Sequence, residues 1–413
     1  MKEVFAEIIT IGDEILYGQI TDTNSQWISA ELDKIGIKTK RKTSVSDKKD
    51  EIVDSLNEAI KRVDIILVTG GLGPTNDDLT KNVLTDYFDT TLELHQGALE
   101  AITAMFKRIG FELTEPNRGQ AFLPKSCTYI PNNFGSAPGM WFEKNGKILV
   151  SMPGVPFEMK GIISNSVLGL LKQQFSLPVI HHKMIRTVGI GESWLAEKIA
   201  DWENNLPNHI KLAYLPGMWQ VRIRLTGVGI DAEILAQEVE DEFNKIKPLI
   251  ATYIFGFGDT ELQEAVGQLL KTKNKTIATA ESCTGGYLAH LFTSISGSSD
   301  YYYGTVVAYQ NAIKTKILDV KQSTLDQHGA VSEETAKEMA EGVRKKLGTD
   351  IGFSTTGIAG PTGGTKSKPV GTVWIALADA EKTIALQVKL GKSRDLNIKY
   401  TAVHALNLIR KNV

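Results

Sequence analysis

Residues 64–78 have the sequence DIILVTGGLGPTNDD, an apolar run followed directly by a glycine-rich segment. The apolar half predicts a short buried strand, and the glycine-rich half predicts a tight turn before the next helical pattern. Apolar runs such as AEIITIG (6–12) and KILVSMPG (147–154) alternate in the same way with helical patterns such as NSQWISAELDKIG (24–36). This alternation is typical of β-α units around a largely parallel sheet, so we predict an α/β fold here.

The chain of 413 residues is long enough for two or three domains, because one domain usually takes roughly 150 residues. The β-α pattern extends to residue 174 and returns from residue 257. Between them, HHKMIRTVGI (181–190) and WQVRIRLTGVG (219–229) predict two strands, next to two helical patterns. We therefore expect an α/β domain over 1–174, a small α+β domain over 175–256 and a second α/β domain over 257–413. The middle domain fits a KH-like module or a plain spacer, and it has no evident GXXG loop.

Composition narrows the class of protein. The 46 Lys and Arg balance 48 Asp and Glu, so the sequence shows no electrostatic footprint for nucleic acid or an anionic membrane. The basic cluster Lys38–Lys42 predicts only a solvated strand edge. Two cysteines, Cys127 and Cys283, exclude a disulfide framework, and the sequence has no 18-residue apolar run. We expect that the first residues are not a signal peptide, because acidic residues interrupt their apolar run. We expect a cytoplasmic protein, with no nucleic-acid or membrane partner.

A first candidate site combines carboxylates with glycine-rich turns after two predicted strands. Both turns would lie at the carboxyl ends of parallel strands, where open α/β sheets bind ligands, so we expect one shared cleft. Backbone N–H groups at the glycines suit a phosphate, and the carboxylates suit a divalent cation. The alternative is a tight turn with Asp77 and Asp78 capping the following helix. The residues concerned are Gly12, Gly70, Gly71 and Gly73 for the phosphate and Asp13, Glu14, Asp77 and Asp78 for the metal.

A second candidate site begins at AESCTGG (280–286), between a predicted strand and a predicted helix. Ser282 at this junction would lie beside the helix N–H groups, which could stabilise an oxyanion or hold a phosphate. The alternative is that Ser282 or Thr284 is an ordinary helix N-cap.

Lys314 strengthens the interpretation of Ser282 as a nucleophile. If Asn311 caps the helix of YQNAIKTKIL (309–318), Lys314 lies on the apolar side with Ile317, whereas Lys316 points the opposite way. A lysine there is either snorkelling or desolvated, and in the second case it could act as a general base for serine. No histidine has a comparable context, so a zinc hydrolase is unsupported.

Cys283 is the other possible nucleophile beside Ser282. No neighbouring residue marks its thiol as activated, so we expect it to pack under the helix. A third glycine-rich segment, TTGIAGPTGG (355–364), follows another apolar strand. Its backbone could surround an anion, or it could form a flexible surface turn.

The motifs GDEIL (12–16), TGGLGPTNDD (69–78) and MPGVPFEM (152–159) resemble the amino-terminal domain of the CinA family of competence- and damage-inducible proteins. The resemblance implies a three-layer, molybdopterin-binding-like fold and metal-dependent hydrolysis of the diphosphate of ADP-ribose. It adds Asn24, Pro153 and Gly154 to the expected ligand-binding residues. Molybdopterin enzymes usually carry Thr at the position of Leu72 and an Arg-Asp pair at Asp77-Asp78, so this chain departs from them.

AESCTGG, YQNAIKTKIL, GAVSEETAKEMAEG (329–342) and TGIAGPTGG (356–364) resemble the carboxyl-terminal domain of the same family, a nicotinamide mononucleotide deamidase. The resemblance implies Ser282 as nucleophile, Lys314 as base and Tyr309 as an assisting hydroxyl, with no cofactor. It also implies a substrate pocket and a phosphate partner, either Arg394 or Lys399. The residues expected around the substrate are Thr284, Gly285, Gly286, Thr356, Gly357, Gly360 and Arg394.

We therefore expect a bifunctional pyridine-nucleotide recycling enzyme, in the form of a homodimer, whose partners are nicotinamide mononucleotide and ADP-ribose. Two alternatives stay open. The first is a molybdopterin-binding factor. The second is a non-enzymatic recruitment protein for DNA uptake or repair, which would need a basic, aromatic-rich face.

Overall fold

The computed structural model describes residues 3–75 and 78–413, so Asn76 and Asp77 lie outside the described residues. The chain divides into two compact units. The first comprises Met1–His181 with Val228–Ala236, and the second comprises His182–Gly227 with Gln237–Val413. Within the described ranges, no helix combines the length and the apolar character that a membrane crossing requires.

The first unit is built on a sheet of strand order β2-β1-β3-β8-β7-β6. The strands β2, β1, β3 and β8 run parallel, and β7 and β6 are antiparallel to their neighbours. Its strands are β1 Val4–Ile11, β2 Ile37–Val45, β3 Ile65–Thr69, β4 Leu92–Leu94, β5 Phe122–Pro124, β6 Thr128–Ile130, β7 Gly139–Lys144 and β8 Lys147–Met152. Its helices are α1 Asp13–Leu16, α2 Thr23–Lys34, α3 Lys49–Arg62, α4 Thr80–Tyr87, α5 Gln96–Ile109, α6 Glu115–Gly119, α7 Pro156–Ile162 and α8 Leu168–Gln174.

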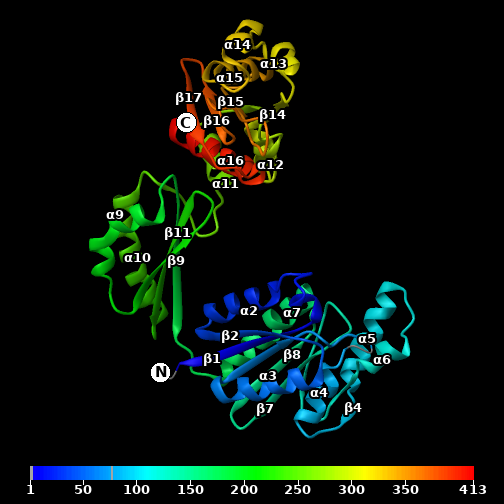
Figure 1. The fold of residues 1–413 in the computed structure, drawn as a ribbon. Helices are drawn as coiled ribbons and strands as arrows, with labels where there is room; N and C mark the ends of the chain where they lie inside the picture. The colour runs from blue at the N-terminus through cyan, green and yellow to red at the C-terminus, as the bar shows by residue number, and fades with distance from the viewer. Residues whose placement is uncertain (1–2, 76–77) are drawn as a thin grey trace. The chain divides into compact units, whose positions relative to one another are not determined.

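Helices cover both faces of this sheet, which explains why its central strands are apolar without interruption. Ala6 and Ile8 of β1 pack in one core with α2 and α7, whereas Ile9 and Ile11 pack in a second core with α3 and α4. Figure 1 shows the two pairs of helices on opposite sides of the strands. The predicted three-layer α/β fold is confirmed. The basic cluster lies on β2, an edge strand, where Lys38, Lys40 and Arg41 are exposed as predicted.

The remaining elements lie in the second unit, except that β9, β11 and α10 each cross the boundary between the two units. Its strands are β9 Val179–Val188, β10 Ile210–Pro216, β11 Gln220–Gly229, β12 Ile254–Phe257, β13 Ile277–Glu281, β14 Tyr302–Val307, β15 Ile351–Gly357, β16 Thr372–Ala378 and β17 Thr383–Lys389. Its helices are α9 Glu192–Asn204, α10 Ala232–Ile250, α11 Leu262–Thr272, α12 Tyr287–Thr293, α13 Asn311–Leu318, α14 Gln322–His328, α15 Glu333–Leu347 and α16 Arg394–Asn412.

The middle region has a sheet of order β10-β11-β9-β12 with α9 and α10, a small KH-like α+β arrangement. The sequence predicted only β9 and β11 of these strands. The segment of β12 contains Gly256 and a register irregularity against β9, so it lacks the alternation of a half-buried strand. The predicted boundary between residues 256 and 257 therefore falls inside a strand.

The carboxyl-terminal region is a second three-layer α/β arrangement. Its sheet has the order β14-β13-β15-β16-β17, with β14, β13 and β15 parallel and the β16–β17 hairpin antiparallel, as predicted. One face packs against α11, α12 and α16, and the other packs against α13, α14 and α15. Figure 1 shows these two sets of helices on opposite sides of the strands.

Arg410 of α16 is joined to the chain segment that enters β12. Its guanidinium donates to the carbonyl oxygens of Thr252 and Ile254, each at 3.0 Å. Burial lowers the pKa of this guanidinium, so loss of these two carbonyl acceptors would leave a partly desolvated cation with fewer partners, although Nε and Nη2 still bond to Oδ1 of Asn407.

We predict that a fragment of residues 257–413 is less stable than one of residues 182–413, by about 1–3 kcal/mol from the lost acceptors of Arg410. Thermal unfolding of the two fragments measures the difference. Arg410→Met should destabilise the longer fragment more than the shorter one. Equal destabilisation of both fragments would contradict the argument.

Candidate functional site

A cavity of about 220 Å³ opens at the carboxyl ends of β13 and β15, next to the first turns of α13 and α16. This is the edge of a parallel sheet at which α/β proteins bind ligands. Its lining residues are Ser282, Cys283, Tyr309, Asn311, Lys314, Ala330, Val331, Thr356, Gly357, Ala359 and Arg394.

Ser282 is the first residue after β13, and its N–H donates to the carbonyl of Thr355 at 2.9 Å. The chain then turns through Gly285 and Gly286, whose φ values of 62° and 99° favour glycine. Gly286 is the N-cap of α12, so the alternative of Ser282 or Thr284 as the helix N-cap is wrong. The turn presents the Ser282 hydroxyl to the cavity.

Lys314 is 1% exposed, and its Nζ donates to the carbonyl of Ala308 at 2.8 Å and to Oγ of Ser282 at 3.2 Å. The predicted inward orientation of Lys314 is confirmed, and Lys316 is exposed. Two details differ from the prediction: Gln310 is the N-cap, and Ile317 is 43% exposed. Burial lowers the pKa of the Lys314 amine, because removal from water disfavours its charged form. Its two hydrogen-bond partners are neutral oxygens and carry no charge that would offset this effect.

Tyr309 and Arg394 form the exposed side of this cavity. The Arg394 guanidinium donates to the Tyr309 hydroxyl and to the carbonyl of Gly360, both at 3.0 Å. Lys399, the other candidate phosphate partner, does not line the cavity and instead bonds to Asp395 at 2.8 Å, which raises its pKa. Of the two candidate phosphate partners, Arg394 and Lys399, the structure places only Arg394 in the cavity lining.

The expected substrate residues divide into two groups. Thr356 and Gly357 line the cavity, although the Thr356 hydroxyl already donates to the carbonyl of Ala330 at 2.6 Å. The others stay outside the lining: Thr284, Gly285, Gly286 and Gly360.

Glu281 is a residue that the sequence reasoning missed. Its carboxylate accepts the N–H groups of Gly286, Leu288 and Ala289 at 2.8–3.1 Å. The predicted use of the α12 N–H groups for an oxyanion is therefore wrong for these three donors. The only signal in the sequence is an acidic residue at the end of an apolar strand.

Cys283 packs in the apolar core with Leu288 and Phe292, as predicted. Its side chain is buried, and burial raises the pKa of the thiol to about 12. The thiolate that cysteine nucleophiles require is therefore disfavoured at neutral pH.

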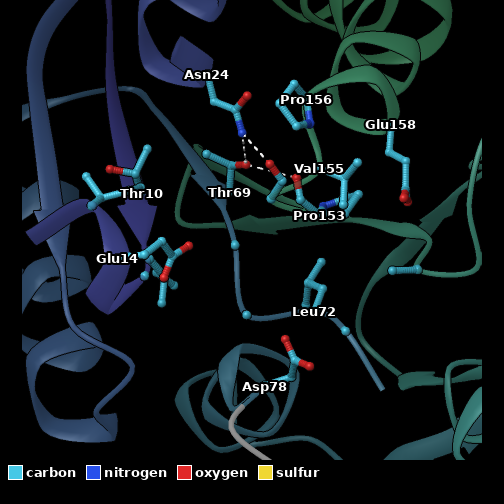
Figure 2. A pocket seen from close by; sticks show the side chains of 18 of the residues that line it. Thr10, Glu14, Asn24, Thr69, Leu72, Asp78, Pro153, Val155, Pro156 and Glu158 are labelled. Carbon is cyan, nitrogen blue, oxygen red and sulfur yellow. Dashed lines mark hydrogen bonds between the residues drawn. The ribbon is translucent and has the colours of Figure 1, made fainter. Parts of the chain in front are cut away.

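A second cavity, of about 520 Å³, lies in the first unit between the turns that follow β1 and β3 (Figure 2). The expected shared cleft is confirmed, because Gly12, Asn24, Gly70, Gly71, Gly73, Pro153 and Gly154 all line it. Gly70 has a φ of 116°, and a Cβ there would meet the carbonyl oxygen of Ile11 at 2.1 Å. The close approach of the two turns therefore depends on glycine at this position.

Carboxylates stand on several sides of this cavity. Glu14 and Asp78 line it, but Asp13 does not: its N–H donates to Asp47, and its carboxylate accepts from Tyr17. Asp78 accepts the N–H and the hydroxyl of Thr75, so it closes this local turn, whereas Leu79 is the N-cap of α4. Asp77, the fourth expected ligand, lies outside the described residues.

The described residues contain no group of three or more His, Cys, Asp or Glu arranged to hold a metal ion. Of the expected metal ligands, Glu14 and Asp78 line the cavity, and two carboxylates would leave most ligand positions of a cation such as Mg²⁺ to other groups.

Three further carboxylates on this cavity were missed from the sequence: Asp22, Asp47 and Glu158. Figure 2 shows Glu158 apart from Glu14 and Asp78 around the cavity. Burial raises the pKa of the Glu158 carboxyl, although a hydrogen bond from Asn132 at 2.6 Å opposes the rise. Lys, Arg and His are absent among the described lining residues.

Through hydrogen bonds, Asn24 holds together two segments that line this cavity. Its Nδ2 donates to the carbonyl of Gly154 at 2.7 Å and to the hydroxyl of Thr69 at 3.2 Å. The Thr69 hydroxyl in turn donates to the carbonyl of Pro153 at 2.9 Å. Asn24 therefore joins the turn after β8 to the end of β3 (Figure 2).

Three family models match consecutive parts of the chain: a probable molybdopterin binding domain over residues 7–173, a damage-inducible protein CinA KH domain over 182–256 and a CinA C-terminal domain over 259–413. A CinA-like protein of Cytophaga hutchinsonii is 55% identical, over 99% of this chain and 98% of the relative. The chain belongs to the CinA family.

Other CinA relatives agree. A CinA-like protein of Flavobacterium psychrophilum is 43% identical over 99% of this chain and 98% of its own. Among solved structures, the competence damage-inducible protein A of Klebsiella pneumoniae is 31% identical, covers 37% of this chain and 94% of that chain, and has a TM-score of 0.36.

Burial of Lys314 in this CinA protein has a consequence for stability. Because the folded state lowers the pKa of the amine below 10.5, the unfolded chain binds more protons between the two pKa values, and stability rises with pH in that window. We predict that the wild type gains stability over Lys314→Met between pH 7 and pH 10, on the order of 1 kcal/mol.

Urea unfolding at both pH values measures the gain. Lys316→Met is the matched control, because Lys316 is exposed on the same helix. The same pH dependence in both variants would contradict a desolvated Lys314.

Proposed function

We propose that the carboxyl-terminal cavity deamidates nicotinamide mononucleotide, which yields nicotinate mononucleotide and ammonia. The observation that carries the proposal is the buried Lys314 amine within hydrogen-bond distance of the Ser282 hydroxyl. Serine-lysine pairs of this kind are an established arrangement for acyl transfer.

In the proposed reaction, Oγ of Ser282 attacks the carboxamide carbon while the neutral amine of Lys314 takes the hydroxyl proton. The carbon–nitrogen bond breaks, and Lys314 returns the proton to the leaving nitrogen, which departs as ammonia. Water then hydrolyses the acyl-serine and regenerates Ser282. The lowered pKa of Lys314 supports this role, because it increases the share of neutral amine near pH 7.

The exposed side of the cavity suits the phosphate of the mononucleotide. Arg394 is the arginine that lines it, and a guanidinium can bind phosphate through two parallel hydrogen bonds. Tyr309 accepts from Arg394 and lines the same cavity, so its hydroxyl can assist at the substrate.

We predict that Ser282→Ala and Lys314→Met each lower the rate of ammonia release from nicotinamide mononucleotide by at least about 1,000-fold, because each removes one half of the nucleophile-base pair. A coupled ammonia assay on the folded variants measures the loss.

Cys283→Ala is the control and should keep a rate near that of the wild type, because its thiol is buried and protonated. Near-normal turnover by Ser282→Ala would refute the nucleophile assignment. In the wild type, the rate should rise with pH through the lowered pKa of Lys314.

We also propose that the amino-terminal cavity hydrolyses the diphosphate of ADP-ribose with a divalent cation. The supporting observation is its charge: carboxylates line the cavity and basic side chains are absent among its described lining residues, so a free diphosphate would be repelled. A diphosphate that arrives with its cation can bind, with Glu14 and Asp78 completing the coordination. The cation would activate water and polarise the phosphorus–oxygen bond.

We predict that a chelator abolishes ADP-ribose hydrolysis and leaves ammonia release unchanged. Because the described carboxylates form no complete metal site, calorimetry should show weak binding of Mg²⁺ alone and clearly tighter binding with a non-hydrolysable ADP-ribose analogue. Tight binding of the cation without the nucleotide would contradict this picture.

The alternatives predict different ligands. A molybdopterin-binding factor would be stabilised against heat by a pterin and not by ADP-ribose, and a recruitment protein would be stabilised by neither. The cytoplasmic location and the homodimer remain predictions from the sequence.

A further inference from the structure

Glu281 is a fully buried carboxylate, and its 0% exposure needs an explanation, because burial of a charge is costly unless hydrogen bonds compensate it. Its Oε2 accepts from the N–H groups of Gly286 and Leu288, and its Oε1 accepts from the N–H of Ala289. The Thr305 hydroxyl lies 3.5 Å from Oε1. The carboxylate is thus compensated by the backbone of the turn that follows Ser282.

The main chain of Glu281 is part of the same arrangement. Its carbonyl accepts the N–H of Ala308 at 2.8 Å, and the carbonyl of Ala308 accepts from Nζ of Lys314. Lys314 donates to Ser282, which follows Glu281 in the chain. A closed ring of bonds therefore connects Glu281, Ala308, Lys314 and Ser282.

These contacts restrain Ser282 from both directions. The side chain of Glu281 binds the far end of the turn, residues 286–289. Its main-chain carbonyl binds Ala308, whose own carbonyl accepts from Nζ of Lys314. With both ends of the loop 282–285 held, the Ser282 hydroxyl can take few positions relative to Nζ of Lys314. A displacement of reacting groups by about 1 Å can cost about 100-fold in rate.

We propose that Glu281 is a positioning residue of the deamidase site: its carboxylate holds the turn after β13 so that the Ser282 hydroxyl stays at the Lys314 amine. This inference rests on the proposed deamidase function. It assigns a role to a residue that does not itself line the cavity and takes no part in the bond changes of the proposed reaction.

The test is Glu281→Gln in the full chain. Glutamine keeps the shape of the glutamate side chain but has one oxygen acceptor where glutamate has two. Its NH₂ group would face backbone N–H donors, with which it cannot form a hydrogen bond. We expect kcat for ammonia release about 100-fold below that of the wild type, with KM within threefold, because the substrate contacts at Arg394 and Thr356 are unchanged.

Asp350→Asn is the matched control. The Asp350 carboxylate accepts the N–H and the hydroxyl of Thr276, both at 2.8 Å, immediately before β13, at the opposite end of the strand from Ser282. It should lower the midpoint of thermal unfolding, as Glu281→Gln does, while its kcat stays within twofold of the wild type.

Three outcomes decide the inference. A folded Glu281→Gln with kcat within threefold of the wild type overturns it, and so does an equal loss of kcat in Asp350→Asn. If Glu281→Gln does not fold, Glu281→Asp takes its place. Aspartate keeps the charge but is one methylene shorter, so kcat should again fall without a change in KM, and an unchanged kcat overturns the inference. A wild type that releases no ammonia refutes the deamidase function itself. This result distinguishes failure of the proposed function from failure of the role of Glu281.

Discussion

The carboxyl-terminal site depends on the contact between the Lys314 amine and the Ser282 hydroxyl, which lie 3.2 Å apart, and this amine is removed from water because Lys314 is 1% exposed. The two residues are 32 positions apart in the chain and meet because β13 and β14 are parallel neighbours that end at the same edge. Lys314 lies in the first turn of α13, which begins four residues after the last residue of β14. Its bonding partners in this contact are neutral oxygens, so burial is the dominant influence on its proton affinity.

The two cavities differ in charge, although both follow glycine-rich turns at the carboxyl ends of parallel strands. The described lining of the carboxyl-terminal cavity has the guanidinium of Arg394 and no Asp or Glu, so its charge favours a phosphorylated ligand. The amino-terminal cavity has carboxylates such as Glu14 and Asp78 around the same kind of edge. A phosphate ligand there must bring positive charge with it. Under the two proposed functions, the same β-α geometry would serve a serine-lysine reaction in one domain and a metal-assisted reaction in the other.

The sequence predicted the parts of the structure that periodicity controls. The β-α alternation around a parallel sheet and the inward side of Lys314 follow from apolar runs and their spacing, the shared cleft follows from turns at the carboxyl ends of parallel strands, and the three-layer arrangement was implied by the family resemblance. It did not predict β12, because Gly256 and a register irregularity hide its strand pattern. The departure of Asp13 from the cleft was also invisible, since it depends on a contact with Asp47, which is distant in the chain.

Glu281 explains why the capping rules did not predict which side chain accepts the N–H groups at the start of α12, in the segment AESCTGG (280–286). A serine or threonine N-cap bonds an N–H two or three residues ahead, so the rule directs attention to Ser282 and Thr284. Here the acceptor lies five to eight residues upstream, in the last residue of β13, and the Glu281 side chain bridges the turn. This arrangement releases the Ser282 hydroxyl from capping the helix. A hydroxyl bound to a helix N–H would have a competing partner, whereas the observed one is free to face the lysine amine.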